Sequence, residues 1–438
     1  MDTYSLIIGI SGIVIVSFFF NILAKRTNIP SVLMLILLGV IIQLFIPEKF
    51  NTDDYADLDT LEVVGNIGLI MIVLEAALDL KLAKEKTKLI ISSFLVALVA
   101  LILTSVSVAA IIYFFVPNTD TFMKALVYGV PLSIMSSAII IPSVSGLTGV
   151  KKEFMVYEGT FSDILGIMAF YFLVGIEKGD GAKEITLNIV LNIIVTVVAS
   201  IVLAYLLTYI FQKLKSQVKL FLIIALLMLM YALGKKLHLS SLLIILAFGL
   251  VLNNASLFFR GKLEKYINEE RVRPILRDFH VLTLESAFVI RTFFFVLFGM
   301  FITLDSVFNL NVALVSIAII AVLYLIRFAT LKIFLKNEIV PQLYIAPRGL
   351  ITILLFFVIG AHPEYVIKDF NPGILLFVIL ISSLIMAWAL IRYRGDKVAD
   401  VLLSQLPGRK VDEDKDGIND ATQDASEENV EKQDFNQF

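Results

Sequence analysis

Long apolar stretches alternate with short polar ones along the chain up to about residue 392. A helix needs roughly 20 apolar residues to cross the hydrocarbon core of a bilayer. Read with that window, the pattern predicts thirteen spans. They cover residues 4–24, 30–46, 62–80, 89–116, 122–147, 155–176, 185–211, 219–234, 239–258, 279–304, 308–335, 340–361 and 372–392. The chain is therefore predicted to be an all-α, polytopic membrane protein.

The composition supports this class and excludes several others. Of the 438 residues, 59% are hydrophobic, whereas soluble domains are about 45–50% apolar. There is no Cys and there are three His, so disulfides and thiolate chemistry are excluded and a zinc or haem site is not expected. No phosphate loop, nucleotide domain or nucleic-acid site is visible. We expect neither a cofactor nor an enzyme activity.

Basic residues between the predicted spans are distributed unevenly. Loops after odd-numbered spans, with the segment just past the last span, hold 22 Lys and Arg, and loops after even-numbered spans hold 7. Because Lys and Arg collect on the cytoplasmic side, the N-terminus is predicted outside and the C-terminus in the cytoplasm of the cell (inner) membrane. The longest cytoplasmic loop, residues 260–280, is predicted to form a basic surface helix.

The last part of the chain differs in character. We predict a transmembrane domain at 1–395 and an acidic cytoplasmic tail at 396–438, which has too few large apolar residues to fold alone. Part of the tail follows the opening of a calcium loop, but Gln423 stands where an EF-hand needs a bidentate Glu. A solvated acidic tail and a weak Ca²⁺ site both remain open. The candidate ligands would be Asp412, Asp414, Asp416 and Asp420.

Two carboxylates lie in the sixth predicted span with no Lys or Arg beside them, in the stretch "YEGTFSDILGIMAF". A charge at bilayer depth costs roughly 2.5–3.5 kcal/mol on insertion scales, so such residues are mostly functional or paired. On a helix, Gly159 and Gly166 lie within about 40–60° of Asp163, with Ser162 beside them. Small residues allow another backbone to come close. We predict an ion or proton site at Asp163, with Glu158 as an accessory about 140° around the helix.

Other charges inside the spans have structural interpretations. Asp79, Glu285 and Arg327 are close enough to span ends to snorkel to the interface. Glu75 lies one turn before Asp79, a like-charge spacing that requires a cation elsewhere. We predict a charge-balancing pair between Glu75 and Arg348.

Two predicted spans contain helix breakers. In the fifth, Pro142 removes a backbone donor and disturbs the carbonyl four residues earlier, close to Ser136 and Ser137. In the twelfth, "PRGL" at 347–350 interrupts the helix. Broken helices at matching positions of two halves are typical of inverted-repeat transporters. We predict that spans 1–6 and 8–13 form inverted repeats, with broken helices 5 and 12 crossing near the midplane. Two ordinary kinked helices are the alternative.

With these motifs in place, residues 5–393 resemble the monovalent cation/proton antiporter superfamily, which includes NhaP-type and sodium/hydrogen exchanger proteins. "EGTFSD" keeps the family's Glu and Asp at Glu158 and Asp163, with Ser162 at the family's Asn. "PRGL" matches the family's Gly-x-Arg-Gly at Arg348 and Gly349. "VLEAALDL" and "RTFFFVLFGM" resemble two further family stretches. The fifth span has no acid, and its "MSSAIIIP" is closer to the potassium-efflux branch.

The resemblance implies a secondary active antiporter that exchanges a monovalent cation for H⁺, and family members are often homodimers. Na⁺ is the expected cation, with Li⁺ or K⁺ as alternatives. Oxygen ligands would come from Asp163, Glu158, Ser162, Ser136 and Ser137. Because Ser162 cannot titrate, electroneutral 1:1 exchange is expected, unless Glu158 adds a proton. A K⁺/H⁺ antiporter or K⁺ efflux system is the main alternative. An organic-anion transporter, a channel and an intramembrane aspartyl protease are more remote.

Overall fold

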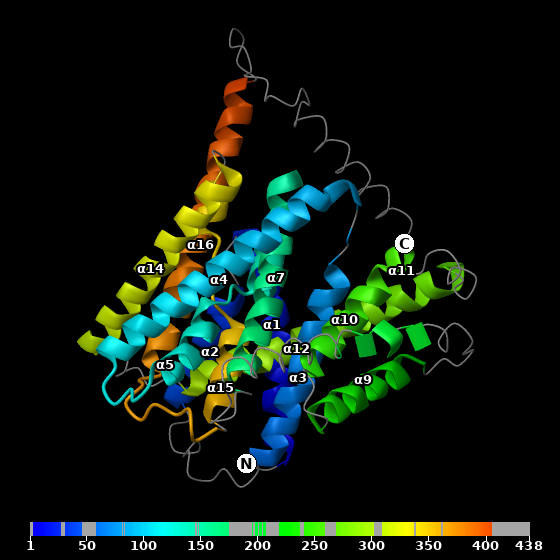
Figure 1. Ribbon diagram of the computed structural model, residues 1–438, viewed down its shortest axis with the longest axis horizontal. Coiled ribbons are helices and arrows are strands. Elements are labelled where there is room, and N and C mark those ends of the chain that lie inside the picture. The colour runs from blue at the N-terminus through cyan, green and yellow to red at the C-terminus, as the bar shows by residue number, and fades with distance from the viewer. Residues whose placement is uncertain are drawn as a thin grey trace. The chain divides into compact units, whose positions relative to one another are not determined.

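In the computed structural model, helices joined by short turns and irregular segments make up the part of the chain that it describes (Figure 1). The described residues are 3–27, 31–45, 58–80, 82, 84–144, 147, 149–174, 195, 198–199, 201–203, 205–206, 219–236, 241–258, 269–301, 309–336, 339–360 and 362–404. The expectation of an all-α membrane protein is confirmed. Contacts divide the chain into two units, Met1–Leu390 and Ile391–Phe438.

The first half of the described chain contains seven α-helices and a short 3-10 helix. They are α1 (Thr3–Thr27), α2 (Ser31–Phe45), α3 (Leu58–Asp79), η2 (Lys84–Lys86), α4 (Thr87–Phe115), α5 (Phe122–Ser133), α6 (Ser137–Ser143) and α7 (Gly149–Val174). The helix α5 begins at a good N-cap, because the Thr121 hydroxyl accepts a hydrogen bond from the Lys124 N–H.

The second half of the described chain contains seven α-helices and one short 3-10 helix. Its elements are α9 (Lys219–Lys236), α10 (Ser241–Asn253), α11 (Ala255–Phe258), α12 (Glu269–Phe301), α14 (Leu310–Leu335), η5 (Gln342–Tyr344), α15 (Leu350–Gly360) and α16 (Gly373–Ser404). In α14 the Asn309 side chain caps the first turn by accepting from the Asn311 N–H.

Most predicted spans coincide with helices of the structure. Six apolar segments within the described residues are long enough to cross a membrane, including 87–115 of α4 and 310–335 of α14. The seventh predicted span, 185–211, lies largely outside the described residues. Helix α12 begins at Glu269, so the second half of the expected surface helix at 260–280 is instead the start of this long helix. Helix α16 continues to Ser404, past the predicted boundary at 395.

The interruptions in spans 5 and 12 are the feature that positions the candidate site. Helix α5 ends at Ser133 and α6 begins at Ser137, with Ile134 and Ser136 in extended conformations between them. In span 12, an irregular stretch separates η5 from α15. The two interruptions meet, since the Ser136 N–H donates to the Pro347 carbonyl oxygen over 2.9 Å. The predicted broken helices are therefore confirmed, and their broken segments contact each other.

Helix packing surrounds this crossing. Helix α4 packs against α5, α7 and α14, and α7 packs against α5 and α6. A second group of contacts joins α2 to α12 and α3 to both α10 and α12. The inverted repeat stays a prediction, and the matched interruptions are consistent with it.

Candidate ion-transport site

Asp163 lies in the middle of α7 and is buried, with 3% of its surface exposed. Its Oδ2 accepts a hydrogen bond from the Ser137 N–H at 3.0 Å. This N–H belongs to the first turn of α6 and has no partner inside that helix. The interruption in span 5 therefore supplies a backbone donor that fixes one oxygen of the carboxylate.

Three other oxygens nearby are buried and lack a hydrogen-bond partner among the described residues. They are Oδ1 of Asp163, Oγ of Ser136 and Oγ1 of Thr160. Thr160 lies one turn before Asp163 on the same side of α7. Buried polar atoms without partners are uncommon in folded proteins and call for an explanation such as an ion or a water. Oxygens of this kind are what a hard monovalent cation requires.

Small residues on α7 allow the interrupted helix to approach Asp163. A Cβ atom on Gly166 would lie 2.2 Å from Ile134 Cγ1, and one on Gly159 would lie 3.1 Å from Ile140 Cδ1. Between these two glycines, the Ser162 Oγ accepts a hydrogen bond from the Met135 N–H at 2.9 Å. The predicted close approach at this stripe is confirmed. Ser162 holds the backbone of the interruption in place.

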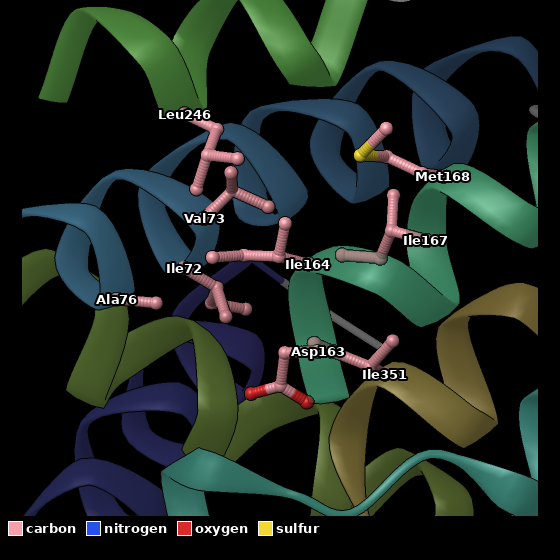
Figure 2. Close-up of a pocket in the computed structure, with 9 residues that line it drawn as sticks. All are labelled: Ile72, Val73, Ala76, Asp163, Ile164, Ile167, Met168, Leu246 and Ile351. Atoms are coloured by element: carbon pink, nitrogen blue, oxygen red, sulfur yellow. The ribbon is translucent and has the colours of Figure 1, made fainter. Parts of the chain in front are cut away.

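A small cavity lies beside Asp163, among α3, α7, α10 and α15. Its volume is about 20 Å³, which is room for about one water molecule. Figure 2 shows that apolar side chains form one side of it and that both carboxylate oxygens of Asp163 point away from them. These side chains include Ile72, Val73 and Ala76 of α3, Leu246 of α10 and Ile351 of α15.

Glu158 has a different environment from Asp163. Its two oxygens accept from the two terminal nitrogens of Arg327 at 2.8 and 3.1 Å, and the side chains are 0% and 4% exposed. The Arg327 Nε also donates to the Gln342 carbonyl oxygen at 3.0 Å. The prediction that Arg327 snorkels is wrong, because the guanidinium is buried in a bidentate pair. The sequence does carry a signal for this pair, since Glu158 and Arg327 are opposite charges without a local partner.

Arg348 binds backbone carbonyls at the end of α5. Its Nε donates to Leu132 O at 3.0 Å and its Nη2 to Ser133 O at 3.3 Å. Carbonyls at a helix C-terminus lack helical partners and carry partial negative charge, which a cation stabilises. Gly349 is required beside it, because a Cβ there would lie 2.8 Å from Ser136 Oγ.

The predicted pair between Glu75 and Arg348 is wrong. The Glu75 carboxylate is 3.0 Å from the Arg291 guanidinium, across the contact between α3 and α12. Arg348 satisfies its charge with carbonyls instead. The Asp79 Oδ1 atom is hydrogen-bonded to the His280 Nε2 atom at 2.8 Å. The Glu285 side chain is exposed.

The remaining predicted residues add little to the site. Pro142 lies in α6, within the interrupted span. The four aspartates of the predicted calcium loop lie outside the described residues. Among the residues that are described, no three His, Cys, Asp or Glu side chains gather at one place.

Comparison with known proteins now identifies the class. The model of the transmembrane sodium/hydrogen exchanger family matches residues 13–392. The chain belongs to this family. It is therefore a multi-pass membrane protein and a cation/proton antiporter, not an enzyme.

Solved structures agree with the fold. The structure of the sodium proton antiporter MjNhaP1 from Methanocaldococcus jannaschii at pH 8 is 20% identical, with a TM-score of 0.68, and covers 93% of this chain and 100% of its own. An electron-microscopy map of MjNhaP1 gives a structure with 20% identity, a TM-score of 0.63, and coverage of 94% and 100%. A search of curated proteins gave no match.

Proposed function

We propose that this antiporter exchanges Na⁺ for H⁺ and that Asp163 is the site the two ions share. The observation that carries the proposal is the buried Asp163 carboxylate, with one oxygen held by Ser137 and the other without a partner among the residues that the structure describes. A carboxylate in this position binds either a proton or a cation, and each displaces the other.

The other ligands would be oxygens close to Asp163. The hydroxyls of Ser136 and Thr160 are buried and available, and backbone carbonyls freed by the interruption and water would complete the shell. Both oxygens of Glu158 are taken by Arg327 in this conformation, which leaves Asp163 as the carboxylate free to exchange ions. Li⁺ follows the same chemistry as Na⁺. K⁺ remains the alternative cation, because span 5 has serines and no acid at its interruption.

Transport is electroneutral under this proposal. Asp163 crosses the membrane either protonated or cation-bound, and both forms carry no net charge at that side chain. Both Glu158 oxygens accept from Arg327, so Glu158 carries no second proton in this proposal, and Ser162 has no titrating group. Movement of the loaded site from one side to the other would be a rigid-body step, as in inverted-repeat transporters. The Lys and Arg bias supports a cell-membrane orientation with the N-terminus outside. A homodimer stays a prediction from the resemblance.

The test uses everted membrane vesicles with a fluorescent reporter of the pH gradient. Na⁺, Li⁺ and K⁺ are added in turn to respiring vesicles that hold wild-type protein, Asp163→Asn or Asp120→Asn. Wild type and Asp120→Asn should dissipate the gradient with Na⁺, because Asp120 is an exposed surface carboxylate. Asp163→Asn should be inactive with every cation.

Three results would each count against one part of this proposal. Exchange that persists in Asp163→Asn removes Asp163 as the shared site. A membrane potential generated by exchange in reconstituted liposomes removes electroneutrality, while leaving the site in place. Activity with K⁺ and none with Na⁺ would favour the K⁺/H⁺ alternative.

A further inference from the structure

A second small cavity lies among α4, the end of α5, α7 and α14, and it shares no lining residue with the cavity beside Asp163. Its volume is about 20 Å³, which suits one water molecule or one monatomic ion and is too small for a larger ion. No carboxylate lines it among the residues that the structure describes. The polar side chains that line it are Thr104, Ser133, Ser162, Arg327 and Arg348.

The two arginines at this cavity differ in what balances their charge. Arg327 forms the bidentate ion pair with Glu158, at 2.8 and 3.1 Å. Arg348 is 4% exposed, and its acceptors are three backbone carbonyls. Within the described part of the chain, Arg348 forms no ion pair. Because a buried charge is costly unless it is paired, the positive charge of Arg348 calls for a negative partner.

The nearby helix ends do not supply that partner. The last carbonyls of α5 carry about half a negative charge, and they accept hydrogen bonds from the Arg348 guanidinium. However, Arg348 also lies just before Leu350, where α15 begins, and a helix N-terminus carries about half a positive charge. Since these two partial charges offset each other, close to a full positive charge remains at Arg348.

Hydrogen-bond donors also remain available at this cavity. Arg348 has five N–H donors and three bond to carbonyls, which leaves two without an acceptor among the described residues. The Ser162 Oγ accepts from the Met135 N–H, and its own proton has no acceptor there. Thr104 is buried, and its hydroxyl makes no hydrogen bond within the described part of the chain. Positive charge and spare donors favour an anion over water, because hydrogen bonds to an ionised group are roughly twice as strong as neutral ones.

We propose that this cavity binds one small monovalent anion, chloride under cellular conditions, held by Arg348, Thr104 and Ser162. The anion balances the charge that Arg348 retains. Arg348 and Ser162 hold the backbone of span 5 at Leu132 and Met135. A bound anion therefore stabilises the interruption in that span.

The anion takes no part in the exchange of ions at Asp163. Neither Asp163 nor Glu158 lines the cavity, so the anion stays bound whichever ion Asp163 holds. It travels with the site in both directions and moves no net charge over a full cycle, so exchange stays electroneutral. The inference does not depend on the role proposed for Asp163.

The experiment follows thermal unfolding of the purified full-length protein in detergent by helical circular dichroism. Sodium gluconate is replaced stepwise by sodium chloride or sodium bromide, at constant Na⁺ concentration, pH and ionic strength. Gluconate is too large for the cavity. The melting temperature of wild type should rise with either halide and then level off. The expected rise is roughly 1–3 °C at tenfold excess of halide over its dissociation constant.

Two variants test the cavity, and a third controls for general salt effects. Thr104→Val removes a hydroxyl donor and keeps the branched shape, and Ala100→Leu fills part of the cavity with a side chain. Both should lose most of the halide-dependent rise, whatever their melting temperature in gluconate. Thr330→Val removes a buried hydroxyl that bonds within its own helix, outside the cavity, and should keep the full rise.

Either of two results overturns the inference. One is a wild-type melting temperature that chloride and bromide leave unchanged. The other is a rise that persists in full in Thr104→Val and Ala100→Leu, because the halide then binds elsewhere. If Ala100→Leu does not yield folded protein, Thr104→Val alone decides. Asp163→Asn should keep the full rise, so the exchange activity of that variant tests the proposed function and not the anion site.

Discussion

The buried pair between Glu158 and Arg327 should be essential to the stability of the protein. Glu158 is fully buried, and the removal of one partner of a buried pair typically costs about 3–5 kcal/mol, because the other charge is left uncompensated. Glu158→Gln should therefore lower the melting temperature of the purified protein in detergent, followed by helical circular dichroism. The double variant Glu158→Gln/Arg327→Met should regain part of the loss. An electrogenic wild type whose exchange becomes electroneutral in Glu158→Gln, with an unchanged melting temperature, would instead indicate that Glu158 titrates during transport.

Residue-level prediction from the sequence succeeds where the chemistry is local and fails where it depends on distant partners. Asp163 stands out from the sequence, because the same span shows both its glycine neighbours and the lack of a Lys or Arg beside it. The partners of Glu75 and Glu158 come from other helices, and one sequence does not specify which helices touch. Thr160 does not stand out from the sequence, because a Thr in a span usually donates to its own helix, as Thr330 donates to the Ile326 carbonyl oxygen.

At the scale of helices, the contact between α2 and α12 depends on two glycines. A Cβ on Gly299 would lie 2.2 Å from the Ile36 carbonyl oxygen, and one on Gly39 would lie 2.1 Å from the Val296 carbonyl oxygen. These obstacles are backbone atoms, so the helices would have to separate. Gly299→Ala should cost about 1–3 kcal/mol, the usual range for overpacking.

The matched control for this contact is Gly12→Ala in α1, where an added Cβ would meet no atom within 4 Å. Ala is the better helix former, so this variant should be as stable as wild type or more so. Thermal unfolding in detergent compares the two. Equal melting temperatures for Gly299→Ala and Gly12→Ala would mean that the two helices can move apart freely.

Helix positions follow from hydropathy, whereas helix ends do not. A search for about 20 consecutive apolar residues finds the part of a helix that lies in the bilayer. It does not find the polar residues by which the same helix continues beyond the bilayer. This is why α12 begins before residue 279 and α16 continues past 395. The interruptions were predictable, because Pro, Ser and Gly act on the local backbone. Their contact through Ser136 and Pro347 joins residues far apart in the chain, and it required the structure.

At the scale of the whole molecule, the two sets of loops should lie on opposite sides of the membrane. The chain has no Cys, so single cysteines can report the side without background labelling. Asp120→Cys and Lys152→Cys are suitable, because both positions are exposed and follow an even and an odd predicted span. In intact cells, a membrane-impermeant maleimide should label Asp120→Cys and leave Lys152→Cys unlabelled. Everted vesicles should reverse the pattern, since the cytoplasmic side then faces the reagent. The opposite pattern in both preparations would invert the proposed orientation.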